Sequence, residues 1–283
     1  MLAIPFMKIL QSPKAVLRWR EKVARPVVLV PTMGALHAGH LSLVDRARKL
    51  AGKGGAVIVS IFVNPTQFGP NEDFSRYPRP LRRDLALCRA RKVDAIFHPS
   101  ADAMYAPDFS TYVEETLLAQ TLCGRSRPGH FRGVCTVVCK LFNIVRPDIA
   151  IFGEKDFQQL AIMRRMVRDL NFPIKVVGEK IVREADGLAL SSRNQYLNAD
   201  ERAQAPVLRA ALVAATKSGK RDPFFLQKLI MQKIESAPLA KIDYVEIVDA
   251  ETLQPATRAT KKMRAAVAVF FGKTRLIDNI EIK

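Results

Sequence analysis

The sequence is short of several residue types, and each shortage narrows what the chain can be. Only 4 of its 283 residues are histidine and only 4 are cysteine. The cysteines form no C-x-x-C pair, and the spacing of Cys135 and Cys139 on an apolar helix favours packing over a metal site or a disulfide. No apolar run approaches the roughly 20 residues of a membrane span. Repeats and low-complexity segments are also lacking.

Acidic residues are scarce relative to basic ones, with 27 Asp and Glu against 45 Lys and Arg and a net charge of +18. Such a balance is typical of proteins that bind nucleic acid, but these cations are spread along the chain. A basic run at residues 82–92 is interpreted as a solvated helix face. The positive electrostatic field of these cations would also steer small substrates that carry phosphates and carboxylates. We therefore expect no specific nucleic-acid partner, although nonspecific RNA binding is compatible with this charge.

The first six residues are apolar but too short for a secretion signal, and Met7 is an alternative start. Without a signal or a membrane span, the sequence predicts a cytoplasmic protein. Hydrophobic residues make up 48% of the chain and charged residues 25%, as is usual for soluble globular proteins. The length allows one large or two moderate domains.

Strand and helix signals alternate over the first 180 residues. Buried strands are predicted at 27–30, 56–62, 94–98, 148–152 and 173–178. Helices are predicted at 12–22, 41–50, 134–145 and 157–170, and a basic helix that follows Pro80 is predicted to end near residue 92. This alternation predicts an α/β fold, a Rossmann-like doubly wound parallel sheet. Residues 101–130 are less regular, with a short strand expected at 111–114, a helix at 115–122 and a basic loop at 124–133.

The pattern changes near residue 180. Helices are predicted at 199–217 and 223–236, followed by strands at 241–248, 265–271 and 274–277. Helices followed by an antiparallel run indicate a second, smaller α+β domain. We therefore predict domains at 1–183 and 184–283, with the second closing over the site of the first.

Residues 31–40, P-T-M-G-A-L-H-A-G-H, connect a buried strand to a helix. Gly34 and Gly39 allow the backbone to approach a ligand, and the helix start favours negative charge. His37 and His40 are spaced to lie on one side of the first helical turn. These features suit the handling of a phosphate chain, whereas the alternative is a plain turn with two incidental histidines.

Three further segments carry candidate polar groups. Asn64 and Gln67 follow the second strand, and their amides suit a substrate with a hydroxyl and a carboxylate. Lys155 at a helix start is unfavourable unless an anion neutralises it. Residues 190–194, L-S-S-R-N, offer hydroxyls and one fixed cation to phosphates. The alternative for Asn64 and Gln67 is a simple turn, and the alternative for Lys155 is a surface lysine paired with Asp156. The alternative for residues 190–194 is a solvated turn.

The H-x-G-H string resembles the signature of the nucleotidylyl transferase superfamily, which includes class I aminoacyl-tRNA synthetases and small adenylyltransferases. The longer string at 31–40 resembles the pantothenate synthetase family, as do F-V-N-P-T-Q-F, G-H-F-x-G, F-G-E-K-D and S-S-R-N further along. The resemblance implies ATP-dependent condensation of pantoate with β-alanine through a pantoyl adenylate, releasing AMP and pyrophosphate. It also implies Mg²⁺ accompanying ATP, no metal ligands on the protein, and a homodimer.

The same resemblance assigns roles to individual residues. The catalytic set is His37, His40, Lys155, Ser191, Ser192 and Arg193. The ATP-binding set adds Pro31, Thr32, Met33, Gly34, Gly39, Gly153, Asp156, Val182 and Leu190. Asn64, Gln67 and Gln159 are assigned to pantoate and β-alanine. Arg132 is either a phosphate ligand or a surface charge, and Asp84 either an outer contact of Mg²⁺ or a helix N-cap.

Two other functions are compatible with part of the sequence. A cofactor adenylyltransferase acting on a phosphorylated acceptor would explain H-x-G-H and S-S-R-N, but not the amide residues. An RNA-binding or tRNA-charging protein would explain the charge, but only about 100 residues follow the first domain and no RNA-binding motif is visible.

Overall fold

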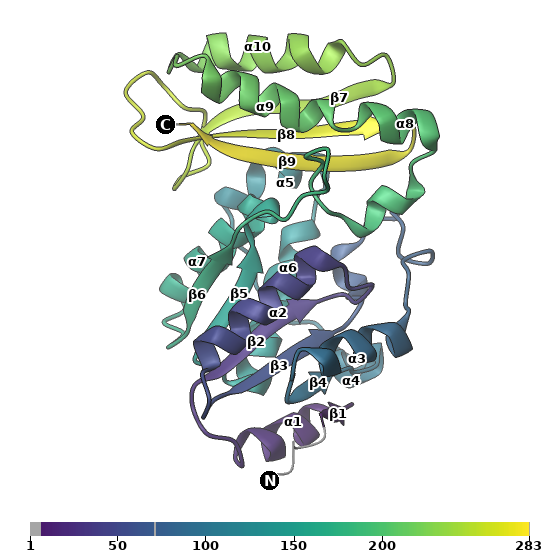
Figure 1. Cartoon of the computed structure of the whole chain (residues 1–283). Helices are drawn as coiled ribbons and strands as arrows, with labels where there is room; N and C mark the ends of the chain where they lie inside the picture. Colours follow the sequence, from purple (N-terminus) through teal and green to yellow (C-terminus); the bar gives the residue numbers. More distant parts are fainter. Residues whose placement is uncertain (1–6, 71, 283) are drawn as a thin grey trace. The chain divides into compact units, whose positions relative to one another are not determined.

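A computed structural model of the chain describes residues 7–70 and 72–282, so the six residues before Met7 lie outside it. The chain forms two compact units (Figure 1). The N-terminal unit contains the chain up to Glu115, Pro128–Glu154 and Ile162–Glu179. The C-terminal unit contains Thr116–Arg127, Lys155–Ala161 and the chain from Lys180. Two segments that precede the predicted boundary at 183/184 thus pack with the C-terminal unit.

The N-terminal unit is built on a six-stranded parallel sheet in the order β1-β4-β3-β2-β5-β6. The strands are β1 (Lys8–Leu10), β2 (Val27–Thr32), β3 (Ala56–Ile61), β4 (Ala95–Phe97), β5 (Ile149–Gly153) and β6 (Lys175–Glu179). The chain runs outward from β2 through β3 to β4 and then continues at β5 on the other side of β2. The order of strands therefore reverses between β2 and β5, where ligands bind in open α/β sheets.

Helices accompany this sheet as its sequence pattern predicts. They are α1 (Pro13–Arg20), α2 (Ala38–Ala51), α3 (Leu81–Ala90), α4 (Ala101–Met104), α6 (His130–Val145) and α7 (Phe157–Asp169). Helix α2 lies across β2 and β3 and buries Leu41, Val44 and Ala47 (Figure 1). Helix α1 starts as expected, because the Ser12 hydroxyl accepts the Ala15 N–H at 3.3 Å.

Residues 101–130 differ from the sequence prediction. The expected strand at 111–114 does not form, and the Val113 N–H instead donates to the Thr136 hydroxyl at 3.0 Å. The expected helix at 115–122 is replaced by η2 (Leu118–Gln120) and α5 (Leu122–Ser126), and α6 begins inside the expected loop. The cause is tertiary: the buried amide of Gln158 binds the Leu118 and Thr121 carbonyls and the Cys123 N–H.

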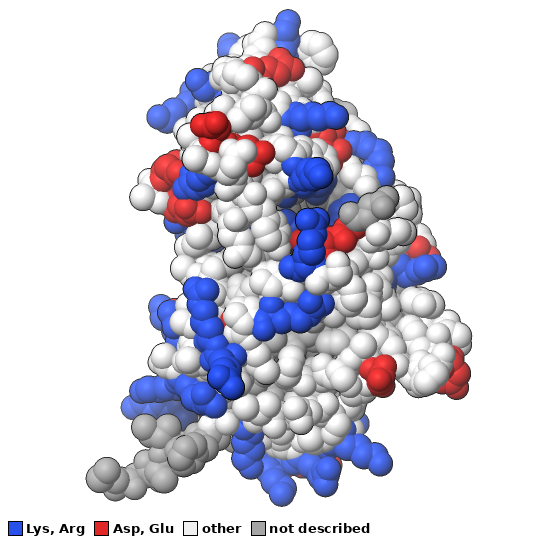
Figure 2. Space-filling view, turned by 90° about the vertical axis from the view of Figure 1, so that its right-hand side faces the viewer, with Lys and Arg blue, Asp and Glu red and all other residues white. Residues whose placement is uncertain are grey.

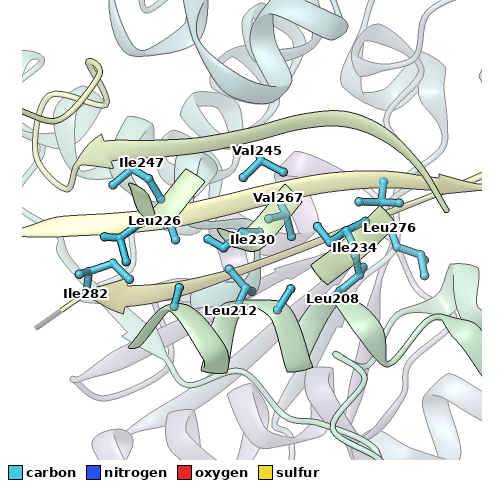
Figure 3. Packing of buried hydrophobic residues seen from close by; sticks show 14 of the residues in the cluster. Leu208, Leu212, Leu226, Ile230, Ile234, Val245, Ile247, Val267, Leu276 and Ile282 are labelled. Carbon is cyan, nitrogen blue, oxygen red and sulfur yellow. The ribbon is translucent and has the colours of Figure 1, made fainter. Parts of the chain in front are cut away.

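The C-terminal unit is an antiparallel sheet covered by helices, as predicted. Its strands are β7 (Ala240–Asp249), β8 (Met263–Phe271) and β9 (Thr274–Ile282), in the order β7-β8-β9. The predicted helix at 199–217 is divided into α8 (Ala199–Gln204) and α9 (Val207–Lys217), because Pro206 lacks an N–H for the helix interior. Figure 3 shows side chains of α9 and α10 (Pro223–Glu235), among them Leu212 and Ile230, packed with Val267 of β8.

The observed architecture confirms the predicted fold class. A parallel sheet with helices is followed by a smaller α+β unit. Among the described residues, no helix is both long enough and apolar enough to cross a membrane.

Truncation of the C-terminal core should be costly. Ile230 is 0% exposed, so Ile230→Ala should lower the free energy of unfolding by about 2–5 kcal/mol through lost burial and a residual cavity. Phe224→Ala on the same helix is the matched control, because Phe224 is 76% exposed and should change stability by about 0.5 kcal/mol or less. Urea unfolding measures both variants. Equal losses in the two would contradict the packing described.

Candidate active site

The turn at residues 31–40 places two imidazoles at the start of α2. His37 is the N-cap residue, and its Nδ1 accepts the Gly39 N–H at 3.1 Å. The His40 Nδ1 accepts the His37 N–H at 3.4 Å, and the two ring centroids are 4.1 Å apart. Because both Nδ1 atoms accept, the ring hydrogen of each histidine is assigned to Nε2. Both histidines can therefore offer an N–H donor, and their predicted proximity is confirmed.

The backbone of this turn is held from α3. Gly34 and Ala35 are left-handed, with φ of 84° and 50°. The Asp84 carboxylate accepts the N–H groups of Ala35 and Leu36, each at 2.9 Å. Asp84 is buried, and this burial raises the pKa of its carboxyl, while the two backbone bonds and the Arg83 charge oppose the rise.

The proposed N-cap role of Asp84 is wrong. The N-cap position of α3 is Pro80, which makes no side-chain cap bond, and Asp84 lies inside the first turn. Its carboxylate is directed to a segment 48 residues or more earlier in the chain.

The loop after β3 forms η1 (Pro65–Gln67) and a buried polar network. The Asn64 side chain is 1% exposed, and its oxygen accepts the Tyr105 hydroxyl at 2.7 Å. Its amide nitrogen donates to the Gln67 side chain at 3.0 Å and to the Gly133 carbonyl at 3.2 Å. Asn64 thus orients Gln67, whose own amide nitrogen lies 3.3 Å from the Met33 sulfur. The structure therefore brings Met33 and Gln67, both predicted site residues, together.

The first turn of α6 fixes this loop through residues to which the sequence assigned no role. The His130 Nδ1 lies 2.8 Å from the Gln67 carbonyl oxygen. Gly133 has no room for a side chain, since a Cβ there would lie 2.2 Å from the Thr66 carbonyl oxygen. The G-H-F-x-G string is the signal that marks both residues. Between them, exposed Arg132 places its guanidinium 4.7 Å from the Tyr112 ring centroid.

Lys155 lies in η3 (Glu154–Asp156), directly after β5, and belongs to the C-terminal unit. Burial lowers the pKa of its ammonium group, and the Arg193 charge lowers it further, while Asp156 and Asp278 oppose this shift. The Lys155 carbonyl accepts the Asn279 side-chain amide at 3.0 Å. Two cations predicted from separate motifs, Lys155 and Arg193, are therefore close enough to interact.

The S-S-R-N segment forms a short turn, η4 (Ser192–Tyr196), with Ser191 as its N-cap. The Ser191 hydroxyl accepts the Arg193 N–H at 3.2 Å. The Asn194 amide donates to Glu184 at 2.7 Å, and the Leu190 N–H donates to the Val182 carbonyl at 3.0 Å. The turn is thereby tied to the extended segment before it, which brings predicted residues Val182 and Leu190 together.

Asp278 and Asn279 are functional candidates that sequence reasoning left without a role. Asp278 is buried and accepts two hydrogen bonds from Arg183, at 2.7 and 2.9 Å. Asn279 accepts from Arg264 at 2.6 Å and donates to Lys155. The string L-I-D-N, residues 276–279, was their only signal in the sequence.

The remaining predicted residues lie at strand and helix ends. Gly153 ends β5, Asp156 is exposed directly before α7, and Gln159 is partly buried in the first turn of α7. Thr32 ends β2, where its hydroxyl donates to the Ser60 carbonyl at 2.7 Å. Within residues 7–70 and 72–282, no three His, Cys, Asp or Glu side chains are grouped to hold a metal ion.

On the face shown in Figure 2, Lys and Arg side chains occur over the whole height of the view, next to Asp and Glu in its upper half and in groups near its lower edge.

The H-x-G-H turn at the switch point of the parallel sheet and the S-S-R-N turn further along the chain are features that resemble the nucleotidylyl transferase superfamily, and the comparisons with known proteins place the chain among ligases. The pantoate-beta-alanine ligase family model matches residues 6–281. Over 279 residues, the chain is 53% identical to the pantothenate synthetase of Thermotoga neapolitana, covering 96% of this chain and 99% of that one. It is 52% identical to the pantothenate synthetase of Heliobacterium modesticaldum, with coverage of 98% and 100%.

Solved structures agree with the sequence matches. The pantothenate synthetase of Thermus thermophilus superimposes with a TM-score of 0.91 at 46% identity, covering 98% of this chain and 99% of that one. The pantoate-beta-alanine ligase of Francisella tularensis, solved with βγ ATP and β-alanine, gives a TM-score of 0.81 at 36% identity, with 97% of each chain covered. The chain belongs to the pantoate–β-alanine ligase family.

Proposed function

We propose that this protein condenses pantoate with β-alanine to give pantothenate, using ATP and releasing AMP and pyrophosphate. The observation that carries the proposal is the pair of imidazoles at the start of α2, whose Nδ1 atoms both accept backbone N–H groups, on a chain of this family. A helix start with Nε2–H donors suits the phosphates of ATP, and the match extends over residues 6–281.

In the first step, the pantoate carboxylate attacks the α-phosphorus of ATP in line, and pyrophosphate leaves. The nucleophile is already an anion, so the enzyme needs positioning and charge stabilisation rather than a general base. We assign the donors of His37 and His40, the charges of Lys155 and Arg193, and the hydroxyls of Ser191 and Ser192 to this task. The other residues of the ATP-binding set inferred from the sequence are likewise proposed to bind ATP.

Pantoate binding is assigned to the amides of Gln67 and Gln159. Asn64 supports this site indirectly, because its oxygen and nitrogen already bond to Tyr105, Gln67 and Gly133. A fixed Gln67 can offer both a donor and an acceptor to a hydroxy acid.

In the second step, the β-alanine amine attacks the carbonyl carbon of pantoyl adenylate and AMP leaves. Mg²⁺ would enter with ATP, held mainly by phosphate oxygens and water. The residues assigned above to the reaction are imidazoles, amides, hydroxyls and cations, which bind phosphates and carboxylates rather than Mg²⁺ itself. We also propose a cytoplasmic location, supported by the use of ATP and by four free cysteine thiols.

His40→Ala should separate the reaction class from its rivals. We expect AMP and pantothenate from the unaltered chain only when pantoate and β-alanine are both present. His40→Ala should lower kcat by about 100- to 1,000-fold, the usual effect of removing a donor aimed at developing charge. Lys49→Ala, an exposed position on the same helix, should leave kcat unchanged. AMP retained in the product, with no β-alanine dependence, would instead indicate an adenylyltransferase.

ATP affinity should depend on the Lys155 charge. Because burial lowers the pKa of Lys155, the unligated protein loses this charge as pH rises through that lowered value. The Kd for ATP should then rise by at most about tenfold per pH unit in alkaline solution. Lys155→Arg should flatten this dependence, since a guanidinium stays charged, and Lys49→Arg should not. Calorimetric titration across pH measures it, and parallel profiles for all three proteins would refute the role of Lys155.

We further propose a homodimer whose C-terminal unit closes over the adenylate, since closure would protect a mixed anhydride from water. Small-angle X-ray scattering should give twice the chain mass of 31.6 kDa and a smaller radius of gyration with ATP and pantoate. A single-chain mass would contradict the dimer, and an unchanged radius would contradict closure.

A further inference from the structure

Asp84 is a buried charge that the proposed reaction does not use. It is 1% exposed in the first turn of α3. Burying a carboxylate is costly unless hydrogen bonds compensate for its lost hydration. Here the compensation comes from backbone, because Oδ2 accepts the Ala35 N–H and Oδ1 accepts the Leu36 N–H, each at 2.9 Å. Both oxygens of the carboxylate are therefore committed to the turn at residues 31–40.

The turn that Asp84 holds is one that a free chain avoids. Ala35 has a φ of 50°, in the left-handed region that is disfavoured for residues with a Cβ. Gly34, at φ 84°, lies so close that a Cβ there would be 3.0 Å from the Asp84 Oδ2 and from the Ile61 Cγ2. Backbone in such a conformation persists only where its surroundings hold it. The Asp84 carboxylate supplies two bonds at this place.

The held segment leads directly into the catalytic histidines. Leu36, whose N–H binds Asp84, precedes His37, and the His37 N–H in turn binds the His40 ring. The direction of both imidazoles thus depends on the backbone path through residues 34–36. A relaxed Ala35 would redirect that path before α2 begins.

We propose that Asp84 is a positioning residue for adenylate formation, whose carboxylate locks the left-handed Gly34–Ala35 turn and so aims His37 and His40. This role rests on the proposed function. It replaces the outer Mg²⁺ contact considered from the sequence, because both carboxylate oxygens face backbone donors and the side chain is buried.

The positioning role of Asp84 is tested with Asp84→Asn and with a second substitution, Ala35→Gly, that should restore part of the lost activity. The amide keeps one acceptor and turns an NH₂ group toward a backbone N–H. We expect kcat for pyrophosphate release from ATP and pantoate to fall by about 10- to 100-fold, as for the loss of one charge-assisted hydrogen bond, with the pantoate KM within about twofold. Adding Ala35→Gly should recover at least about fivefold, because glycine adopts positive φ without steric cost.

Lys92→Gly provides the matched control in the same background. Lys92 also has positive φ, at 55°, and it lies exposed just after α3. It should restore nothing. Recovery by Lys92→Gly equal to that by Ala35→Gly would overturn the proposal, as would recovery of Asp84→Asn by raised Mg²⁺, which would mark a metal contact.

A second variant keeps the test valid if Asp84→Asn fails to fold. Ala35→Val leaves Asp84 and α3 unchanged and alters the turn itself. Because a β-branched residue strongly disfavours positive φ, this substitution should destabilise the left-handed conformation at residue 35. It should lower kcat at least about tenfold, whereas Lys92→Val should not. A kcat within twofold of the unaltered protein for either Asp84→Asn or Ala35→Val would overturn the proposal.

Hydrogen exchange separates this inference from the proposed function. The amides of Ala35 and Leu36 should exchange faster in Asp84→Asn than in the unaltered chain, while the amides of β2 stay protected. This readout needs no substrate, so it stands even if the condensation reaction is absent. Unchanged exchange at both amides would refute the clamp.

Discussion

Parallel pairing in the central sheet is the constraint on which the N-terminal site depends. Because β2 pairs with β3 on one side and β5 on the other, the segments that follow these strands leave the same edge. The histidine turn follows β2 and the Asn64–Gln67 loop follows β3, which explains the contact between Met33 and Gln67. No local signal could join these segments, since 34 residues separate them.

The polar groups at this edge of the sheet are fixed by hydrogen bonds from other side chains, which support them and are not assigned to a substrate. Asp84 fixes the backbone ahead of His37, and Asn64 and His130 fix Gln67. Each support is a buried or half-buried group that makes hydrogen bonds to other segments of the protein. Such supports limit the motion of the donors, which is what electrostatic stabilisation of a transition state requires.

The C-terminal unit brings two positive charges, those of Lys155 and Arg193, close enough to repel each other. Lys155 and Arg193 disfavour one another, and Asp278 offsets part of that repulsion while it also binds Arg183. An arrangement of cations that is unfavourable by itself would become favourable beside a bound polyphosphate, which is the role proposed for these two residues. The Asn279 bond to the Lys155 carbonyl shows how β9 takes part in holding a residue that lies 124 positions earlier.

The sequence by itself determined the strands, most helices and the class of chemistry, because burial periodicity, the Ser12 cap and the H-x-G-H turn are local properties. It failed over residues 101–130, where hydrogen bonds from the distant Gln158 side chain override local preference. It also misjudged Asp84 as a possible cap and gave no role to His130, Asp278 or Asn279. Those roles depend on partners more than 40 residues away, so only the tertiary structure could decide them.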